Sequence, residues 1–237
     1  MSRISTLLLS LLSVSALSAQ AGVIIGGTRI IYPSDQSEVQ ISLKNRDADK
    51  RYLVQSWVSN PDDSKAPFVI TPPIYKMDEN QQTLLHVVYT GDKAALPQDR
   101  ESLFTANIKS VAAIPANLRD KNSLQFAIKT RIKLFYRPAS LSANAAKTAW
   151  EKLQFSRQGD QLLVSNPTPF YVSFEKLAVG GKDIPPPETN GQPSALTMMV
   201  PPFGQQSYRI PAGSRGNVSW SAVNDYGSVT KPQQKAL

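Results

Sequence analysis

The sequence contains no cysteine and a single histidine in 237 residues. Without cysteine the chain can form neither a disulfide nor a thiolate metal site, so its fold must depend on full-sized apolar cores. The one histidine, His86, lies in an alternating apolar run and is expected to be a strand residue rather than a catalytic base. Acidic pairs lie at predicted turns, where solvated charges are common, and no G-x-S-x-G motif occurs. We therefore expect no enzymatic activity, no cofactor and no metal site.

Long apolar runs are also scarce. The exception is Leu7–Leu17, which follows the basic Arg3 and precedes the small-x-small sequence Ala19-Gln20-Ala21. This order predicts a cleaved signal peptide over residues 1–21, with a mature chain that begins at Gly22. Because the run is too short to span a bilayer, we expect an exported, soluble protein that does not insert into a membrane.

The formal net charge is +8, but the basic residues are scattered along the chain. They form no basic helix and match no RNA-binding signature, and an exported protein rarely meets nucleic acid. The sequence therefore argues against a nucleic-acid partner. The basic balance instead favours protein partners that carry acidic groups or carboxylates.

From residue 22 onward, short alternating runs are separated by clusters of Pro, Asn, Asp and Gly, and no helical period is evident. The first set comprises Val23–Tyr32, Glu38–Lys44, Arg51–Ser59, Phe68–Thr71, Gln82–Tyr89, Glu101–Ala113 and Asn122–Pro138. After an Ala- and Ser-rich linker at 139–147, the second set comprises Leu153–Ser156, Gln161–Ser165, Tyr171–Val179, Met198–Val200, Gln206–Ile210, Asn217–Val223 and Ser228–Thr230. This pattern predicts an all-β protein with two immunoglobulin-like sandwich domains, at 22–140 and 147–237.

The run at 122–138 is far longer than the usual strand of about 5–6 residues. Leu124, Phe126 and Ile128 alternate with smaller or polar residues, so three bulky apolar groups share one face. A strand of this length outruns its own sheet, and basic residues interrupt it as they do where unwanted edge pairing must be discouraged. We interpret it as a strand that pairs with another chain, although the pattern alone leaves open an ordinary core strand.

Seven segments, spread in order over the mature chain, resemble the periplasmic chaperones of the chaperone–usher pathway. They are Gly22-Val23, Thr28–Pro33, Thr71–Pro73, Leu96–Phe104, Ile132–Pro138, Asn166–Pro169 and Asn224–Gly227. The most specific are P-Q-D-R-E-S-L-F, within the fourth segment, and I-K-L-F-Y-R-P, the fifth. The resemblance implies a chaperone located in the periplasm. It would bind, fold and cap pilus or fimbrial subunits and deliver them to an outer-membrane usher.

The resemblance also implies an L- or boomerang-shaped pair of domains and assigns residues to roles. Leu124, Phe126 and Ile128 match the donor residues that fill the groove of an incomplete subunit. Arg29 and Lys133 match the basic pair that anchors the subunit's terminal carboxylate in the cleft between the domains.

Three further residues, Glu101, Arg137 and Asp225, match an interdomain ion-pair network that holds the domain angle. The short segment at about 115–122 resembles that of the subgroup with a short connecting loop. The sequence leaves open whether the free protein pairs with itself to cover its exposed edge.

A rival interpretation is an exported adhesin or carbohydrate-binding sandwich. Such a protein would require exposed aromatic residues gathered on one face. Trp57, Trp150 and Trp220 are far apart in the sequence and give this alternative little support.

Overall fold

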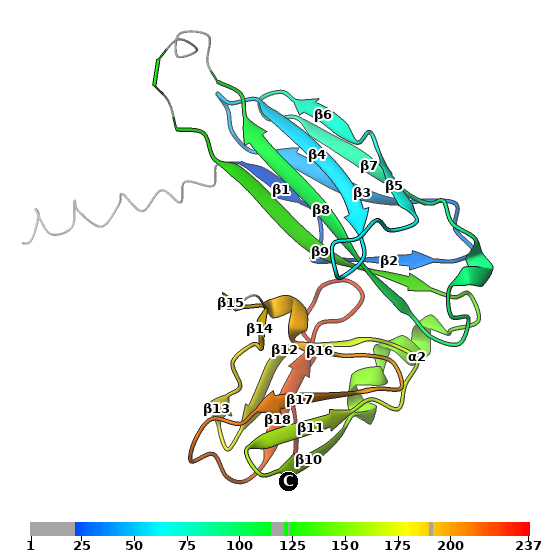
Figure 1. The fold of residues 1–237 in the computed structure, drawn as a ribbon, viewed down its shortest axis with the longest axis vertical. Coiled ribbons are helices and arrows are strands. Elements are labelled where there is room, and N and C mark those ends of the chain that lie inside the picture. The colour runs from blue at the N-terminus through cyan, green and yellow to red at the C-terminus, as the bar shows by residue number, and fades with distance from the viewer. Residues whose placement is uncertain (1–21, 115–120, 123, 190–191) are drawn as a thin grey trace, which may run out of the picture.

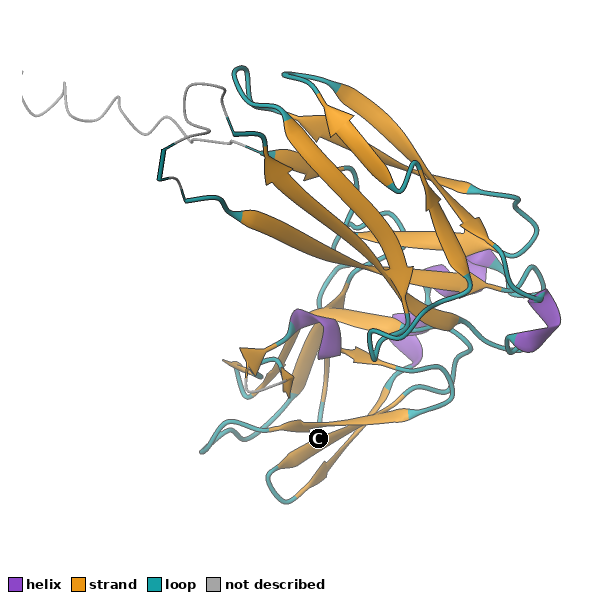
Figure 2. Ribbon diagram, turned by 45° about the horizontal axis from the view of Figure 1, so that its top comes forward, coloured by secondary structure: helices purple, strands orange, loops and turns teal. Residues whose placement is uncertain are grey.

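The computed structural model describes residues 22–114, 121–122, 124–189 and 192–237. The predicted signal peptide and most of the predicted short loop therefore lie outside the described residues. Strands form nearly all of the regular structure, and two lobes meet at an angle (Figures 1 and 2). Each lobe has its own cluster of buried apolar side chains. The predicted all-β, two-sandwich, boomerang-shaped architecture is confirmed.

Two sheets pack face to face in the first lobe. One has the order β1-β3-β7-β5, with β1 (Val23–Ile25), β3 (Val39–Asn45), β7 (Gln82–Tyr89) and β5 (Phe68–Thr71). The other has the order β2-β9-β8-β4-β6, with β2 (Arg29–Pro33), β9 (Ala127–Arg137), β8 (Ser102–Ala112), β4 (Tyr52–Ser59) and β6 (Ile74–Met77). Alternate residues of these strands fill the core between the sheets, as the period of two predicted.

The first predicted run, Val23–Tyr32, is divided between the two sheets, because β1 pairs with β3 whereas β2 pairs with β9. The crossing occurs at Gly26 and Gly27. The Gly26 amide donates to the Ser42 carbonyl at 2.8 Å, and a Cβ atom on Gly26 would lie 1.9 Å from the Ser42 hydroxyl. Gly27 has a φ of +114°, which favours glycine. This division and the short β6, which the sequence analysis missed, raise the seven expected strands to the nine described here.

In the second lobe, β10 (Gln154–Gln158), β11 (Gln161–Ser165) and β17 (Gln205–Arg209) form one sheet. The other contains β12 (Val172–Val179), β13 (Lys182–Asp183), β16 (Met199–Val200), β18 (Val218–Ala222) and β19 (Gln233–Lys235), and β14 (Glu188–Thr189) pairs with β15 (Gln192–Pro193).

Two expectations for this half of the chain were wrong. The run Ser228–Thr230 is not a strand and makes only an isolated bridge, between Val229 and Val223, so the chain pairs with β18 later, through β19. Part of the predicted linker forms a short helix, α2 (Ala143–Lys147), because alanine has the highest helix propensity.

The alternation along β9 places two different surfaces on one strand. Even-numbered residues from Ile132 to Tyr136 belong to the core of the first lobe. The odd-numbered residues between Lys133 and Arg137 therefore point toward the second lobe. Phe135 illustrates this, since its ring lies 5.4 Å from the ring of Tyr171, which precedes β12.

Candidate functional site

The strand β9 has one paired edge and one edge that is only partly covered. β8 pairs with β9 along its whole length, from Ala127 to Tyr136. On the other side, β2 runs parallel to β9 and pairs only with Lys133–Arg137. Among the described residues, no strand pairs with this second edge between Ala127 and Ile132. Unpaired backbone N–H and C=O groups on such an edge are a template for another chain.

The row of apolar residues predicted to meet another chain lies beside this free edge. Leu124, Phe126 and Ile128 are 80%, 71% and 59% exposed. Ile128 shares a face with the core residues of β9, Leu124 and Phe126 precede the strand, and all three lie beyond the end of the core. Together with neighbouring residues of β4 and β8, they line an open groove of about 380 Å³. Large apolar groups left exposed in this way mark an interaction surface.

The regular part of this strand begins at Ala127, not at residue 122 as expected. The ladder with β8 ends at the pair Val111–Ala127, so the preceding residues have no strand to pair with. Gln125 instead donates a side-chain hydrogen bond to the Ala112 carbonyl at 2.7 Å. A β-strand is maintained by its neighbours, and here the neighbour ends first.

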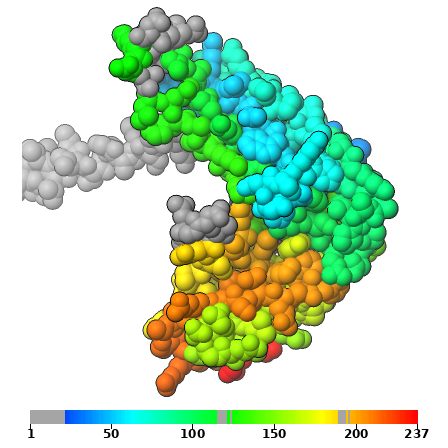
Figure 3. Space-filling model, viewed as in Figure 1, coloured from blue at the N-terminus to red at the C-terminus, as the bar shows by residue number. Residues whose placement is uncertain are grey.

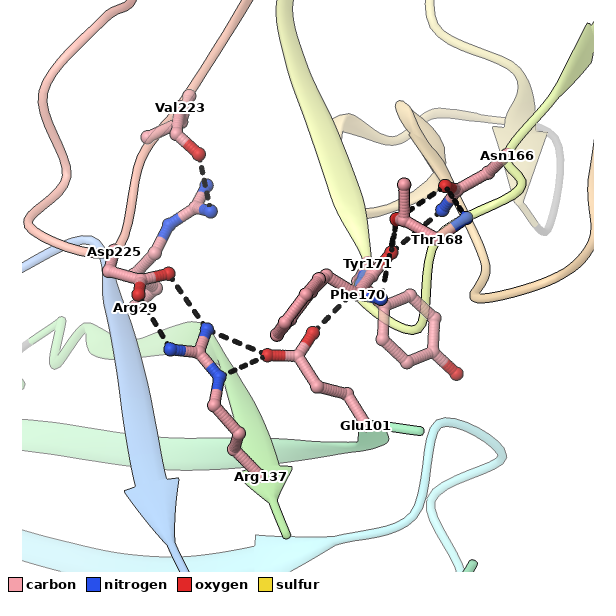
Figure 4. A network of polar contacts seen from close by, with 9 residues as sticks. All are labelled: Arg29, Glu101, Arg137, Asn166, Thr168, Phe170, Tyr171, Val223 and Asp225. Carbon is pink, nitrogen blue, oxygen red and sulfur yellow. Dashed lines mark hydrogen bonds and ion pairs between the residues drawn. The ribbon is translucent and has the colours of Figure 1, made fainter. Parts of the chain in front are cut away.

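Arg29 and Lys133 are direct neighbours in the parallel register of β2 and β9. Arg29 donates to the Val223 carbonyl at 2.7 Å (Figure 4). Lys133 is 9% exposed and donates to the Ser173 hydroxyl at 3.3 Å. Neither cation forms an ion pair with a carboxylate within the described residues. The site therefore holds two neighbouring positive charges that lack a close anionic partner.

Burial and proximity perturb both cations. Burial, assisted by the charge of Arg29, lowers the pKa of Lys133 to about 8. Burial also lowers the pKa of Arg29, against the opposing influence of Asp225 and Glu101. The Arg29 Nε atom is buried without a hydrogen-bond partner. An anion bound here would relieve both the electrostatic cost and the missing hydrogen bond.

Glu101, Arg137 and Asp225 form one continuous network across the interface between the lobes (Figure 4). Arg137 contacts the Glu101 carboxylate at 2.7 Å and binds Asp225 with two hydrogen bonds of 2.7 and 2.9 Å. The Glu101 carboxylate also accepts a hydrogen bond of 2.8 Å from the backbone N–H of Tyr171. Since Asp225 and Tyr171 belong to the second lobe, the network joins the two lobes.

Opposing effects act on the charges in this network. Burial raises the pKa of the Glu101 carboxyl, whereas the charge of Arg137 and the hydrogen bond from the backbone N–H of Tyr171 lower it. Burial acts against the charged form of Arg137, but Asp225 and Glu101 together raise its pKa. Removal of Arg137 would leave the buried Glu101 carboxylate without its cationic partner.

The structure thus brings Arg29, Glu101, Arg137 and Asp225 together at the junction of the lobes, and it places Lys133 beside them. Sequence reasoning missed partners that act through the backbone, namely the Val223 carbonyl and the Tyr171 amide. It also missed Ser173, whose hydroxyl meets Lys133. Backbone groups and a serine inside a strand carry no distinctive sequence signal.

Other candidate chemistry is absent from the part of the chain that the structure describes. His86 lies in β7, as predicted, with its Nδ1 2.8 Å from the Glu38 carboxylate. No group of three or more His, Cys, Asp or Glu in the described ranges could hold a metal ion. No described helix combines the length and the apolar character needed to cross a membrane.

The tryptophans do not form an exposed aromatic face. Trp220 is buried in the second lobe and Trp150 packs against the same core. Trp57 lies in the first lobe, beneath the Lys129 ammonium at 5.2 Å from the ring centre. The tryptophans therefore do not supply the exposed aromatic face that the carbohydrate-binding interpretation requires.

The fold and the site together define a two-domain β-sandwich protein whose exposed strand edge is suited to binding another polypeptide. Residues 22–142 match the family described as "Pili and flagellar-assembly chaperone, PapD N-terminal domain". Residues 148–234 match "Pili assembly chaperone PapD, C-terminal domain". The chain therefore belongs to the PapD family of pilus assembly chaperones, which are not enzymes.

Similar proteins agree with this assignment. The chain is 37% identical over 213 residues to the chaperone protein FimC of Escherichia coli K12, covering 90% of this chain and 83% of FimC. It is 36% identical over 216 residues to the chaperone protein LpfB of Salmonella typhimurium, covering 90% and 88%. Among solved structures, the complex of Salmonella enterica SafA pilin with the SafB chaperone matches with a TM-score of 0.77 and 33% identity. That match covers 92% of this chain and 97% of the solved chain.

Proposed function

We propose that this protein is a periplasmic chaperone that binds, folds and caps pilus or fimbrial subunits and delivers them to an outer-membrane usher. It would do so by lending β9 to an incomplete subunit, a process known as donor-strand complementation. The observation that carries this proposal is the exposed row of Leu124, Phe126 and Ile128 beside an unpaired edge of β9. The related SafB chaperone was solved in complex with a pilin.

The energetics of strand addition suit this arrangement. Backbone hydrogen bonds along the free edge provide affinity, and the alternating side chains fill pockets in the partner. Three large apolar side chains contribute roughly 1.5–3 kcal/mol each when fully buried, or roughly 5–9 kcal/mol together. Association costs reduce this sum, which leaves a complex that a better-fitting strand can displace.

The two cations provide the second part of the proposed site. Arg29 and Lys133 lie at the place where β2 takes over the edge of β9. A subunit strand on the free edge would therefore have to end at these residues. If its terminal carboxylate binds there, the added strand runs parallel to β9 and pairs with the part of the edge that β2 leaves free, in line with β2. The cations would thus set the register of the added strand through charge-assisted hydrogen bonds.

The ion-pair network gives the lobes a defined angle, and we assign it a structural role. Arg137 is held between Glu101 of its own lobe and Asp225 of the other. We further propose a signal peptide at 1–21, an N-terminal domain at 22–140 with the donor segment at about 122–138, and a C-terminal domain at 147–237.

Co-purification tests the proposal. The full precursor is expressed with an affinity-tagged pilin subunit, and periplasmic extracts are applied to the affinity resin. The wild-type chain should elute in equimolar amount with the subunit, whereas Arg29→Ala and Lys133→Ala should be lost with their fold retained. Lys44→Ala, which alters an exposed lysine of β3 in the other sheet of the first lobe, is the matched control. Normal capture by Lys133→Ala would refute the anchor assignment.

A further inference from the structure

The Lys133 side chain forms part of the wall of a cavity between the two lobes. This cavity, the cleft pocket, has a volume of about 430 Å³, within the range of about 300–1,000 Å³ that is typical of ligand pockets. Figure 3 shows the hollow between the lobes, where the green part of the first lobe faces the yellow and orange parts of the second. Its principal lining residues are Leu103, Thr105, Lys133, Tyr171, Met199 and Gln206.

The walls of the cleft pocket come from both lobes and are mainly apolar. Leu103 projects from β8, and Met199 projects from β16. Tyr171 closes one side, where its ring packs on Phe135. The exposed lining of the pocket is mostly carbon, although polar groups are present at Thr105 and Gln206. An apolar surface of this kind is stabilised when an apolar group fills it.

Both cations that line the pocket have partners under the proposed function, so neither is left to attract an acidic side chain. Arg131, which also lines it, is already paired with Asp63 at 3.0 Å. Lys133 is the remaining cation of the lining, and under the proposed function it binds the terminal carboxylate of the subunit. The side chain of the same terminal residue is attached to the carbon that carries this carboxylate, so it would lie next to the mainly apolar lining of the pocket.

We propose that the cleft pocket receives the side chain of the subunit's last residue and selects a large apolar or aromatic one. This inference rests on the proposed function, because it presumes that the terminal carboxylate binds Lys133. The pocket is then a specificity site: the cations recognise that a chain ends, and the pocket recognises which residue ends it.

Peptide binding tests the inference. Peptides of about a dozen residues, taken from the carboxyl end of a pilin, are prepared with Phe, Leu, Ala or Glu as the last residue. Their affinities for the mature chain are measured by isothermal titration calorimetry. Because each buried methylene changes affinity about fourfold, Phe and Leu peptides should bind at least tenfold more tightly than Ala, and Glu no better than Ala.

Substitutions in the chain test whether the cleft pocket causes the preference for the last residue of the peptide. Leu103→Ala combined with Met199→Ala should reduce the Phe-to-Ala ratio to about threefold or less. Leu84→Ala, an exposed leucine on the other sheet of the first lobe, should leave the ratio unchanged. Equal affinities for the four peptides, or a ratio that survives the double substitution, would overturn the inference.

A peptide with an amidated terminus separates this inference from the proposed function. Amidation should weaken binding for both the wild type and the double variant, because it removes the group that the cations recognise. Equal binding of acid and amide peptides would refute the carboxylate anchor itself. Carboxylate dependence without a preference for the last side chain would refute the cleft pocket alone.

Discussion

Replacement of Lys133 by methionine should make the chain more stable and abolish its capture of subunits. Methionine keeps the length of the side chain but removes a buried charge. The pKa of Lys133 falls from 10.5 to about 8 in the folded chain. Because each tenfold change in proton affinity corresponds to about 1.4 kcal/mol, the charged lysine costs the native state up to roughly 3 kcal/mol. Under the proposed function the same charge binds the subunit, which would explain why this cost is retained.

The sign of the pH dependence follows from the lowered pKa. Between pH 8 and pH 10.5 the unfolded chain holds a proton on Lys133 that the folded chain has released, so native stability rises with pH. The gain in native stability from Lys133→Met should therefore be complete below pH 8 and should disappear near pH 10.5. Binding of a carboxylate peptide to the wild type should move in the opposite direction, weakening about tenfold between pH 7 and pH 9 as Lys133 loses its charge.

Denaturant titrations of the wild type and Lys133→Met, at pH 7 and at pH 10, measure the difference in unfolding midpoint. Calorimetry with acid and amide peptides measures capture. Lys44→Met, which removes an exposed lysine of β3, should change neither quantity. A Lys133→Met midpoint equal to or below that of the wild type at pH 7 would show that burial of the cation carries no such cost.

Three further predictions concern other parts of the chain. Arg137→Ala should lower the unfolding midpoint by the equivalent of about 3–5 kcal/mol, because it leaves the buried Glu101 carboxylate without its cationic partner. The loss should become smaller as the pH falls, because burial raises the pKa of Glu101 and so favours its neutral form. An unchanged midpoint would contradict the structural role of the pair. Phe126→Asp should abolish subunit capture and shift stability by less than about 0.5 kcal/mol, since the side chain is 71% exposed; a large loss of stability in thermal unfolding would contradict its position outside the core. Lys109→Glu should stabilise the first lobe by about 0.2–1 kcal/mol, because it replaces a like-charge pair opposite Lys129 by an attractive one, and a lowered thermal midpoint would argue against this cross-strand contact.

Much of the architecture could be predicted because buried apolar residues and exposed polar residues alternate along a strand with a period of two. The alternation in β3, β4, β7 and β8 identified these strands and the residues that fill their core. The exceptions are informative. β6 has only four residues, which is too short a run for a readable alternation. The passage of the chain between sheets at Gly26 depends on the close approach of Ser42, which no local pattern encodes.

The candidate site was predicted unevenly for the same reason. The apolar row of the donor segment is a local pattern and is visible in the sequence. Arg29 is distant in the sequence from Lys133, and Arg137 from Asp225, and only a resemblance to known chaperones suggested that each pair meets. The Tyr171 amide and the cleft pocket arise where two lobes come together, and neither could be read from the chain itself.

The sequence by itself determined that the chain is all-β, that it relies on apolar cores without disulfides, and that one strand carries more apolar surface than its own sheet can bury. These properties depend on residue type and spacing over a few neighbours. The tertiary structure alone decided which edge of β9 stays free and which two cations become buried neighbours on β2 and β9. It also decided the shape of the cavity between the lobes. Those features depend on contacts between residues far apart in the chain, whose geometry is set only when both lobes have packed.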